Sequence, residues 1–126
     1  MEKSPALAAL SALAHDTRLD IVRLLVRHRP GGMPAGSIAQ AVNTSASGLT
    51  FHLKLLEQAD LITARRDGRK VIYALNCEQM GGLVHYLISD CCANAPEVRD
   101  RCRLHGGGQN QSDDAAPSTP SGTLKI

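Results

Sequence analysis

Three signals in a row at residues 43–75 constrain the fold of this chain most. A turn of helix-capping residues, Asn43-Thr44-Ser45, is followed by an amphipathic segment that predicts a helix over 45–58. Its leucines, at i, i+4 and i+7, mark one buried face: Leu49, Leu53 and Leu56. Two short segments rich in Ile, Val, Thr and Tyr come next, 61–65 and 70–75, and the Asp67-Gly68 pair between them predicts a β-hairpin.

Apolar periodicity predicts further helices on both sides of this segment. The first spans 6–14, with Leu7, Leu10 and Leu13 along one side. The second runs to about residue 28, capped by Asp16 or Thr17, with its apolar residues inward and Arg18, Arg23 and Arg27 left to solvent or a partner. A short third helix begins near Pro34. The last, over 78–90, carries a stripe made of Met80, Leu83, Val84, Leu87, Ile88 and Cys91, and its Gly81-Gly82 pair indicates a close approach or a late start.

Composition limits the chain to one domain and a tail. It has 126 residues, 43% of them hydrophobic, but only three aromatic side chains, so the core must be aliphatic. Residues 106–126 are rich in Gly, Ser, Pro and Asn and are expected to be disordered, which leaves 1–105 as the folded domain. The expected class is mainly α with a β-hairpin. With no apolar run long enough to span a bilayer and no signal peptide, the chain is expected to be cytoplasmic, without a membrane partner.

A short helix, a polar turn and an amphipathic helix predict a helix-turn-helix, and the hairpin after it predicts a wing. The net charge is only +2, so contact with nucleic acid requires a local patch. Such a patch is present, because the hairpin carries four cations in six residues. The predicted contacts to double-stranded DNA are Ser45, Ser47, Gly48, Thr50, Phe51, His52 and Lys54 on the helix and Arg65, Arg66, Arg69 and Lys70 on the wing.

The motifs LSALAHDTRLDI (10–21), SGLTFHLKLL (47–56), ADLI (59–62) and RDGRK (66–70) resemble the ArsR/SmtB family of metal- and metalloid-responsive bacterial repressors. The resemblance covers about residues 5–92. It implies a winged helix-turn-helix, a homodimer formed by the first and last helices, a two-fold symmetric operator, and release from DNA when an inducer binds.

The resemblance also points to a sensor made of cysteines. No thiol is present at the start of the third helix, where many arsenic sensors of the family carry a cysteine box. The adjacent Cys91 and Cys92 instead resemble an arsenical-responsive subgroup, with Cys102 as the third ligand on a loop after Pro96. Soft thiolates suit trivalent arsenic, as arsenite or methylarsenite, with antimonite as a further candidate. Cys77 is expected to be a small core residue.

Several alternatives stay open on sequence grounds. Cys91, Cys92, Cys102 and His105 could form a Cys₃His site for zinc or cadmium. A disulfide with Cys102 could make the chain a redox sensor. The last helix could serve dimerisation alone, without DNA. An enzyme is not expected, because no nucleophile motif, phosphate loop or paired carboxylate site is found.

Overall fold

The computed structural model describes residues 1–107, with side chains through Arg103. Two compact units make up this part of the chain, Met1–Tyr86 and a second that begins at Leu87. The predicted disordered tail, 106–126, lies outside the described residues apart from its first two positions, which end a helix. Within the described residues no helix is both long and apolar enough to cross a membrane.

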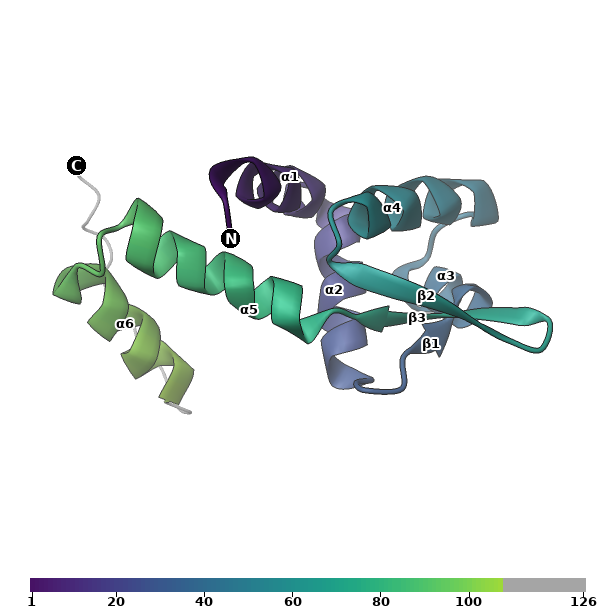
Figure 1. The fold of residues 1–126 in the computed structure, drawn as a ribbon. Coiled ribbons are helices and arrows are strands. Elements are labelled where there is room, and N and C mark those ends of the chain that lie inside the picture. Colours follow the sequence, from purple (N-terminus) through teal and green to yellow (C-terminus); the bar gives the residue numbers. More distant parts are fainter. Residues whose placement is uncertain (108–126) are drawn as a thin grey trace. The chain divides into compact units, whose positions relative to one another are not determined.

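The first unit follows the predicted order of helices and hairpin (Figure 1). Its elements are α1 (Lys3–Leu13), α2 (Asp16–Arg27), β1 (Met33–Pro34), α3 (Ala35–Val42), α4 (Ala46–Gln58), β2 (Ile62–Asp67), β3 (Lys70–Leu75) and α5 (Cys77–His85). The core is aliphatic as expected, and its largest fully buried side chains are Ile21, Leu25, Ile38, Leu56, Leu61 and Ile62. The leucine stripe of α4 is buried, which confirms the prediction from its spacing.

A third strand, β1, was not predicted. It pairs antiparallel with β3, Met33 opposite Tyr73 and Pro34 opposite Ile72, so the sheet order is β1-β3-β2. Gly32 leads into this strand with a φ of 85°, and a β-carbon there would collide with the carbonyl of Tyr73. The glycine therefore allows the loop after α2 to lie directly on the sheet.

The side of α1 that packs inward is the alanine side. Ala6, Ala9 and Ala12 are buried, whereas Leu7 is 57% exposed and Leu10 is also exposed. Small side chains let α1 approach α2 and α4 closely, and the leucines are left on the outside.

The ends of two helices differ from the predictions. The cap of α2 is neither Asp16 nor Thr17 but His15, whose Nδ1 accepts the Thr17 N–H at 3.1 Å. The glycine pair does not delay α5, which starts at Cys77 with Asn76 as its cap. The glycine pair does not mark a close approach within the described residues either, since a β-carbon at Gly82 would meet only the Met1 side chain at an ordinary 3.5 Å and one at Gly81 would meet nothing within 4 Å.

The end of the predicted last helix is a π-helical segment, Tyr86–Cys91, that leads into the second unit. The loop predicted around Cys102 is wrong, because a further helix, α6 (Pro96–Gly107), contains it. Ala93 and Asn94 make the turn with positive φ. Pro96 was read as a helix breaker, but at the first helical position its fixed φ suits the start of a helix.

Candidate nucleic-acid interface and cysteine site

Helix α4 presents a polar face opposite its buried leucines. The Ser45 side chain caps the helix, accepting the Gly48 N–H at 3.1 Å. Ser47, Thr50 and Lys54 are exposed, as predicted, and Phe51 is 58% exposed. The Thr50 hydroxyl donates to the Ala46 carbonyl at 3.0 Å, which holds its methyl group and oxygen in one rotamer. The helix therefore offers small polar groups and one aromatic ring to a partner.

The wing is a regular hairpin whose cations are nearly all unpaired. Strands β2 and β3 pair from Ile62 opposite Leu75 to Asp67 opposite Lys70, and Gly68, with a φ of 66°, opens the two-residue turn. Arg65 donates to the Gly31 carbonyl at 3.1 Å and so ties the wing to the loop before β1. The only ion pair in the described part of the chain is Arg99–Asp100. Arg66, Arg69 and Lys70 thus have no carboxylate within bonding distance.

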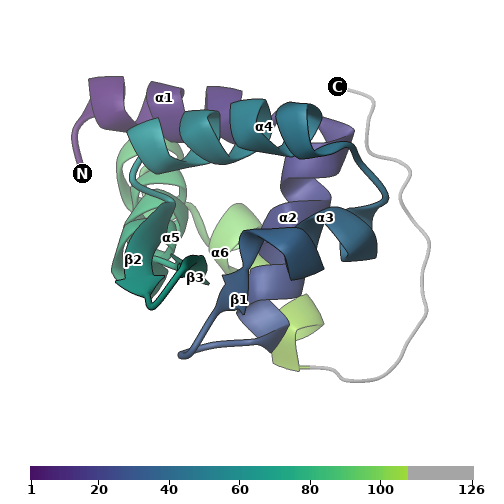
Figure 2. The ribbon, with the colours of Figure 1, turned by 90° about the vertical axis from the view of Figure 1, so that its right-hand side faces the viewer.

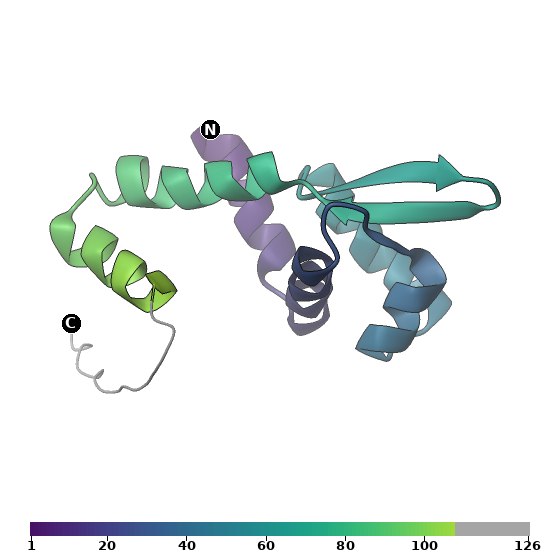
Figure 3. The same ribbon diagram turned by 90° about the horizontal axis from the view of Figure 1, so that it is seen from below.

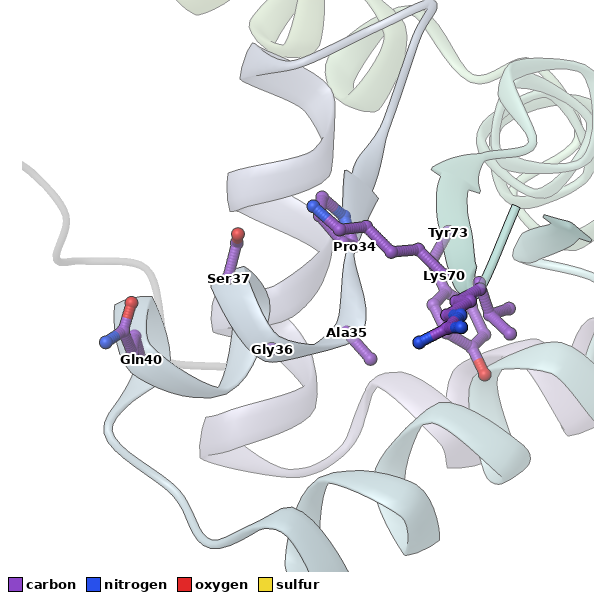
Figure 4. A pocket seen from close by; sticks show the side chains of 9 residues that line it. Pro34, Ala35, Gly36, Ser37, Gln40, Lys70 and Tyr73 are labelled. Atoms are coloured by element: carbon purple, nitrogen blue, oxygen red, sulfur yellow. The ribbon is translucent and has the colours of Figure 1, made fainter. Parts of the chain in front are cut away.

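These elements share one face of the first unit. Figure 2 looks onto this face, where helix α3 lies between the hairpin and the start of α4. Figure 3 shows the hairpin extending past the helices at the same end of the unit. Between the first turn of α3 and the hairpin is an open hollow of about 650 Å³. Ser37 and Gln40 line it from α3, and Lys70 and Tyr73 line it from the hairpin (Figure 4).

His52, predicted as a base contact, is half-buried, and its Nδ1 is hydrogen-bonded within the protein. Arg18 Nη1 lies 3.1 Å from its Nδ1, and the His15 ring lies 4.6 Å away between centroids. Desolvation by burial, then the charges of His15 and Arg18, lower the pKa of His52. The prediction that Arg18 faces solvent or a partner is wrong, since only 8% of it is exposed. Helical periodicity placed it outside the apolar stripe, but the end of α1 covers it and accepts from its Nε at the Ala12 carbonyl, 2.6 Å away.

The four cysteines are free thiols. Cys91 ends the π-helical segment and is exposed, the adjacent Cys92 is half-buried, and Cys102 is exposed on α6. Partial burial, then a hydrogen bond and the charge of Cys91, raise the pKa of the Cys92 thiol. Cys77 is the exposed first residue of α5, so its predicted place in the core is wrong.

Among the side chains that the structure describes, no three of His, Cys, Asp or Glu are gathered into a metal-binding cluster. Cys91 and Cys92 are therefore paired only by being adjacent in the chain, and Cys102, on α6, does not join them in a three-residue cluster. The His105 side chain, the fourth ligand of the alternative zinc site, lies outside the described residues.

Comparison with known proteins identifies the family of this chain. Residues 13–65 match a family model described as a helix-turn-helix domain. The transcriptional repressor SdpR of Bacillus subtilis is 32% identical over 78 residues, which cover 62% of this chain and 83% of SdpR. The chain belongs to the ArsR/SmtB family of winged-helix transcriptional regulators.

Two further relatives agree with this assignment. A probable mercury resistance operon repressor of Streptomyces lividans is 28% identical over 102 residues, 79% of this chain and 78% of the relative. The structure of an ArsR-like transcriptional regulator from Rhodococcus has the same fold, with a TM-score of 0.64 at 19% identity over 80% of this chain and 92% of that one. The winged helix-turn-helix is thereby confirmed, and the chain is a transcriptional repressor of the ArsR/SmtB type that binds DNA, not an enzyme.

Proposed function

We propose that this repressor leaves its operator when trivalent arsenic binds the thiolates of Cys91 and Cys92, with Cys102 as the third ligand for arsenite. The observation that carries the proposal is the pair itself, two adjacent free thiols at the end of the π-helical segment. Soft, thiophilic ions are selected by such ligands, whereas zinc is held by four ligands in a tetrahedron.

The separation of Cys102 from the pair favours some arsenicals over others. A methylarsenical has one position filled by carbon and needs only two thiolates, which Cys91 and Cys92 provide in adjacent positions. Arsenite and antimonite take three, so they require α6 to bring Cys102 to the pair. Methylarsenite is therefore expected to be the inducer whose binding requires the smallest rearrangement of the protein. The relation to a mercury resistance repressor supports a soft inducer and adds Hg²⁺ to the ions that need testing.

DNA binding is proposed to require a homodimer. Leu7 and Leu10 are exposed on α1, and Val84 is exposed on α5, so both helices keep apolar side chains uncovered within this unit. A second copy of the chain that covers these faces would pair two recognition helices α4 about a two-fold axis. Two such helices engage half-sites about 34–36 Å apart, and in this proposal arsenic bound at Cys91 and Cys92, which follow α5, changes that spacing.

The proposed DNA contacts are drawn from the residues predicted on α4 and on the wing. Ser47, Thr50, Phe51 and Lys54 face the groove in this proposal, and Arg66, Arg69 and Lys70 contact phosphates. Ser45 and Gly48 hold the N-terminus of α4 through the cap, and Arg65 orients the wing through Gly31. The part taken by His52 is treated separately below.

The test is a release assay on a DNA duplex that the reduced protein selects from a random pool. Binding is followed by fluorescence anisotropy while arsenite, methylarsenite, Hg²⁺ or Zn²⁺ is added. The variants are Cys91→Ser, Cys92→Ser and Cys102→Ser, and Cys77→Ser is the matched control, since it removes an exposed thiol outside the proposed site.

Methylarsenite should release the wild type, Cys77→Ser and Cys102→Ser, but neither variant of the pair. Arsenite release should be lost in all three site variants. Release of the wild type by Zn²⁺ alone would favour the Cys₃His alternative, and release by a thiol oxidant alone would favour the redox alternative. Either result would overturn the arsenic assignment while leaving the repressor itself in place.

A further inference from the structure

Arg18 is the only buried charged side chain that the structure describes in this chain. It starts from α2 and bridges two other helices, because its Nε donates to the Ala12 carbonyl of α1 and its Nη1 lies against His52 Nδ1 of α4. One guanidinium therefore joins the end of α1 to the helix that carries the predicted base contacts.

The surroundings of this guanidinium determine what state His52 must be in. No carboxylate lies within ion-pairing distance of Arg18 in the described part of the chain, so a buried cation is compensated by other acceptors. The Ala12 carbonyl, in the last turn of α1, is at the negative end of a helix dipole. Arginine only donates hydrogen bonds, so His52 Nδ1 must accept, with the ring neutral and its proton on Nε2.

We propose that Arg18 and His52 form a clamp that positions the recognition helix α4, so that His52 supports operator binding through Arg18 rather than by reading a base, and that acidification opens the clamp and weakens operator binding. The inference rests on DNA binding, a property of the family, and is independent of the cysteine site.

The charges of the two titratable or charged groups that face His52, His15 and Arg18, oppose its protonation. From the corner between α1 and α2 these are the His15 ring, 4.6 Å away, and Arg18. On its own helix the neighbour is the uncharged ring of Phe51, edge to face with His52 at 5.6 Å between centroids. A protonated His52 would lose the acceptor on Nδ1 and place a second positive charge against Arg18. The lowered pKa of His52 agrees with this geometry, because it keeps the ring neutral at the pH where the clamp must close.

The clamp matters for DNA binding because of where His52 lies on α4. It stands between Phe51, which is exposed, and Leu53, which is buried, and is therefore on the flank of the helix. Losing a contact on one flank lets the helix rotate about its leucine stripe. Such a rotation displaces Ser47, Thr50 and Lys54 together, and small displacements are enough to disturb hydrogen bonds to base edges.

The experiment compares operator and random-sequence duplexes between pH 7.5 and pH 5.5, with denaturant unfolding of each protein in the same buffers. His52→Asn keeps an acceptor oxygen near the position of Nδ1 but cannot be protonated. Arg18→Met removes the guanidinium and keeps much of the length of the side chain. His28→Asn is the matched control, since His28 is exposed at the end of α2 and its ring bonds only the Leu24 carbonyl within its own helix.

The wild type and His28→Asn should lose operator affinity as the pH falls to 5.5, by less than about tenfold for each His52, because the pKa of His52 lies below its ordinary value and a ring with that ordinary value would give about tenfold. Affinity for random-sequence DNA should not fall with it, since protonation adds positive charge. His52→Asn should bind the operator at pH 7.5 almost as the wild type does and keep that affinity at pH 5.5. Arg18→Met should be weakened at both pH values, and the double variant should be no weaker than Arg18→Met alone.

Two results would overturn the proposal. One is a folded His52→Asn protein that loses operator affinity equally at both pH values, because this would mean that His52 reads a base directly. The other is a wild-type pH profile in His52→Asn. If Arg18→Met does not fold, the pH profile of His52→Asn decides the matter alone.

Discussion

The strongest quantitative prediction concerns the wing. The side chains of Arg66 and Arg69 are exposed and have no carboxylate partner and no hydrogen bond in the described structure, so truncating them leaves the backbone pairing of the hairpin intact. Arg65 is left in place because it bonds to the Gly31 carbonyl. The double change Arg66→Ala/Arg69→Ala therefore removes charge without removing a contact that holds the fold.

The magnitude follows from counterion release. Each phosphate contact contributes about 0.9 to the slope of log K against log salt, so two lost cations per protomer, four in the proposed dimer, make the slope shallower by about 3.6. Between 50 and 200 mM salt the wild type should then lose about 150-fold more operator affinity than the double variant does. The loss should be nearly the same on any DNA sequence, because phosphate contacts carry no sequence information.

The assay is anisotropy of the selected operator duplex and of a scrambled duplex, measured over a salt series. Lys3→Ala is the charge control, since α1 begins at Lys3 and the N-terminus lies at the opposite end of the unit from the hairpin tip (Figure 1). The control should keep the wild-type slope. A double variant with the wild-type slope would refute the reasoning, because it would mean that the hairpin cations are not on the DNA.

Three further predictions concern the stability of the elements that carry this interface, and each is measured by denaturant unfolding. Ser45→Ala should cost about 1 kcal/mol, because it removes the acceptor for the Gly48 N–H at the start of α4. Its control is Ser47→Ala, which removes only the long 3.4 Å contact between the two hydroxyls and leaves the cap acceptor in place. Gly32→Ala should cost more than about 1 kcal/mol, since its φ is positive and its β-carbon would strike the Tyr73 carbonyl, whereas Gly31→Ala, with open space around it, should be nearly neutral; equal effects would contradict this account. The free energy of unfolding should fall as the pH drops below about 6.5, because the pKa of His52 is lower in the folded than in the unfolded protein. The stability that the neutral His52 ring contributes is complete above its unfolded pKa and is lost as the pH falls to its folded pKa. His52→Asn should flatten this part of the curve of stability against pH.

The helix-turn-helix and the wing could be predicted from the sequence because their signals are local. The spacing of Leu49, Leu53 and Leu56 identifies the buried side of α4 wherever that helix lies. The Asp67-Gly68 pair predicted the hairpin, although the two turn residues are Gly68 and Arg69, because Asp67 still pairs with Lys70. The same signals predicted that Ser47, Thr50 and Lys54 are exposed. For the exposed face of α4, one local pattern sufficed, because the inward and outward sides of an amphipathic helix are set together.

Strand β1 and helix α6 were missed for opposite reasons. A strand of two residues is too short to show a hydrophobic period, so the sequence could not predict β1. It is a strand because Tyr73 and Ile72, far along the chain, pair with it. Helix α6 is polar on most sides, so its apolar pattern is weak, and Pro96 concealed its start. The preference of proline for the first helical position was the signal that could have predicted α6. Its discovery changes the cysteine site, since Cys102 sits on a helix and not on a free loop.

What the sequence by itself determined is therefore the order of the elements, the aliphatic core, the buried leucines of α4 and the basic, exposed wing. What only the tertiary structure decided is how side chains on different helices meet. Arg18 was expected at the surface from its place beside the stripe of α2, and His52 was expected in the groove from its place on α4. Their contact, together with the inward alanines of α1, depends on which helix covers which. A helical repeat records the angle of a side chain about its own axis, but the energy of burying a charge depends on the neighbour that supplies its acceptor.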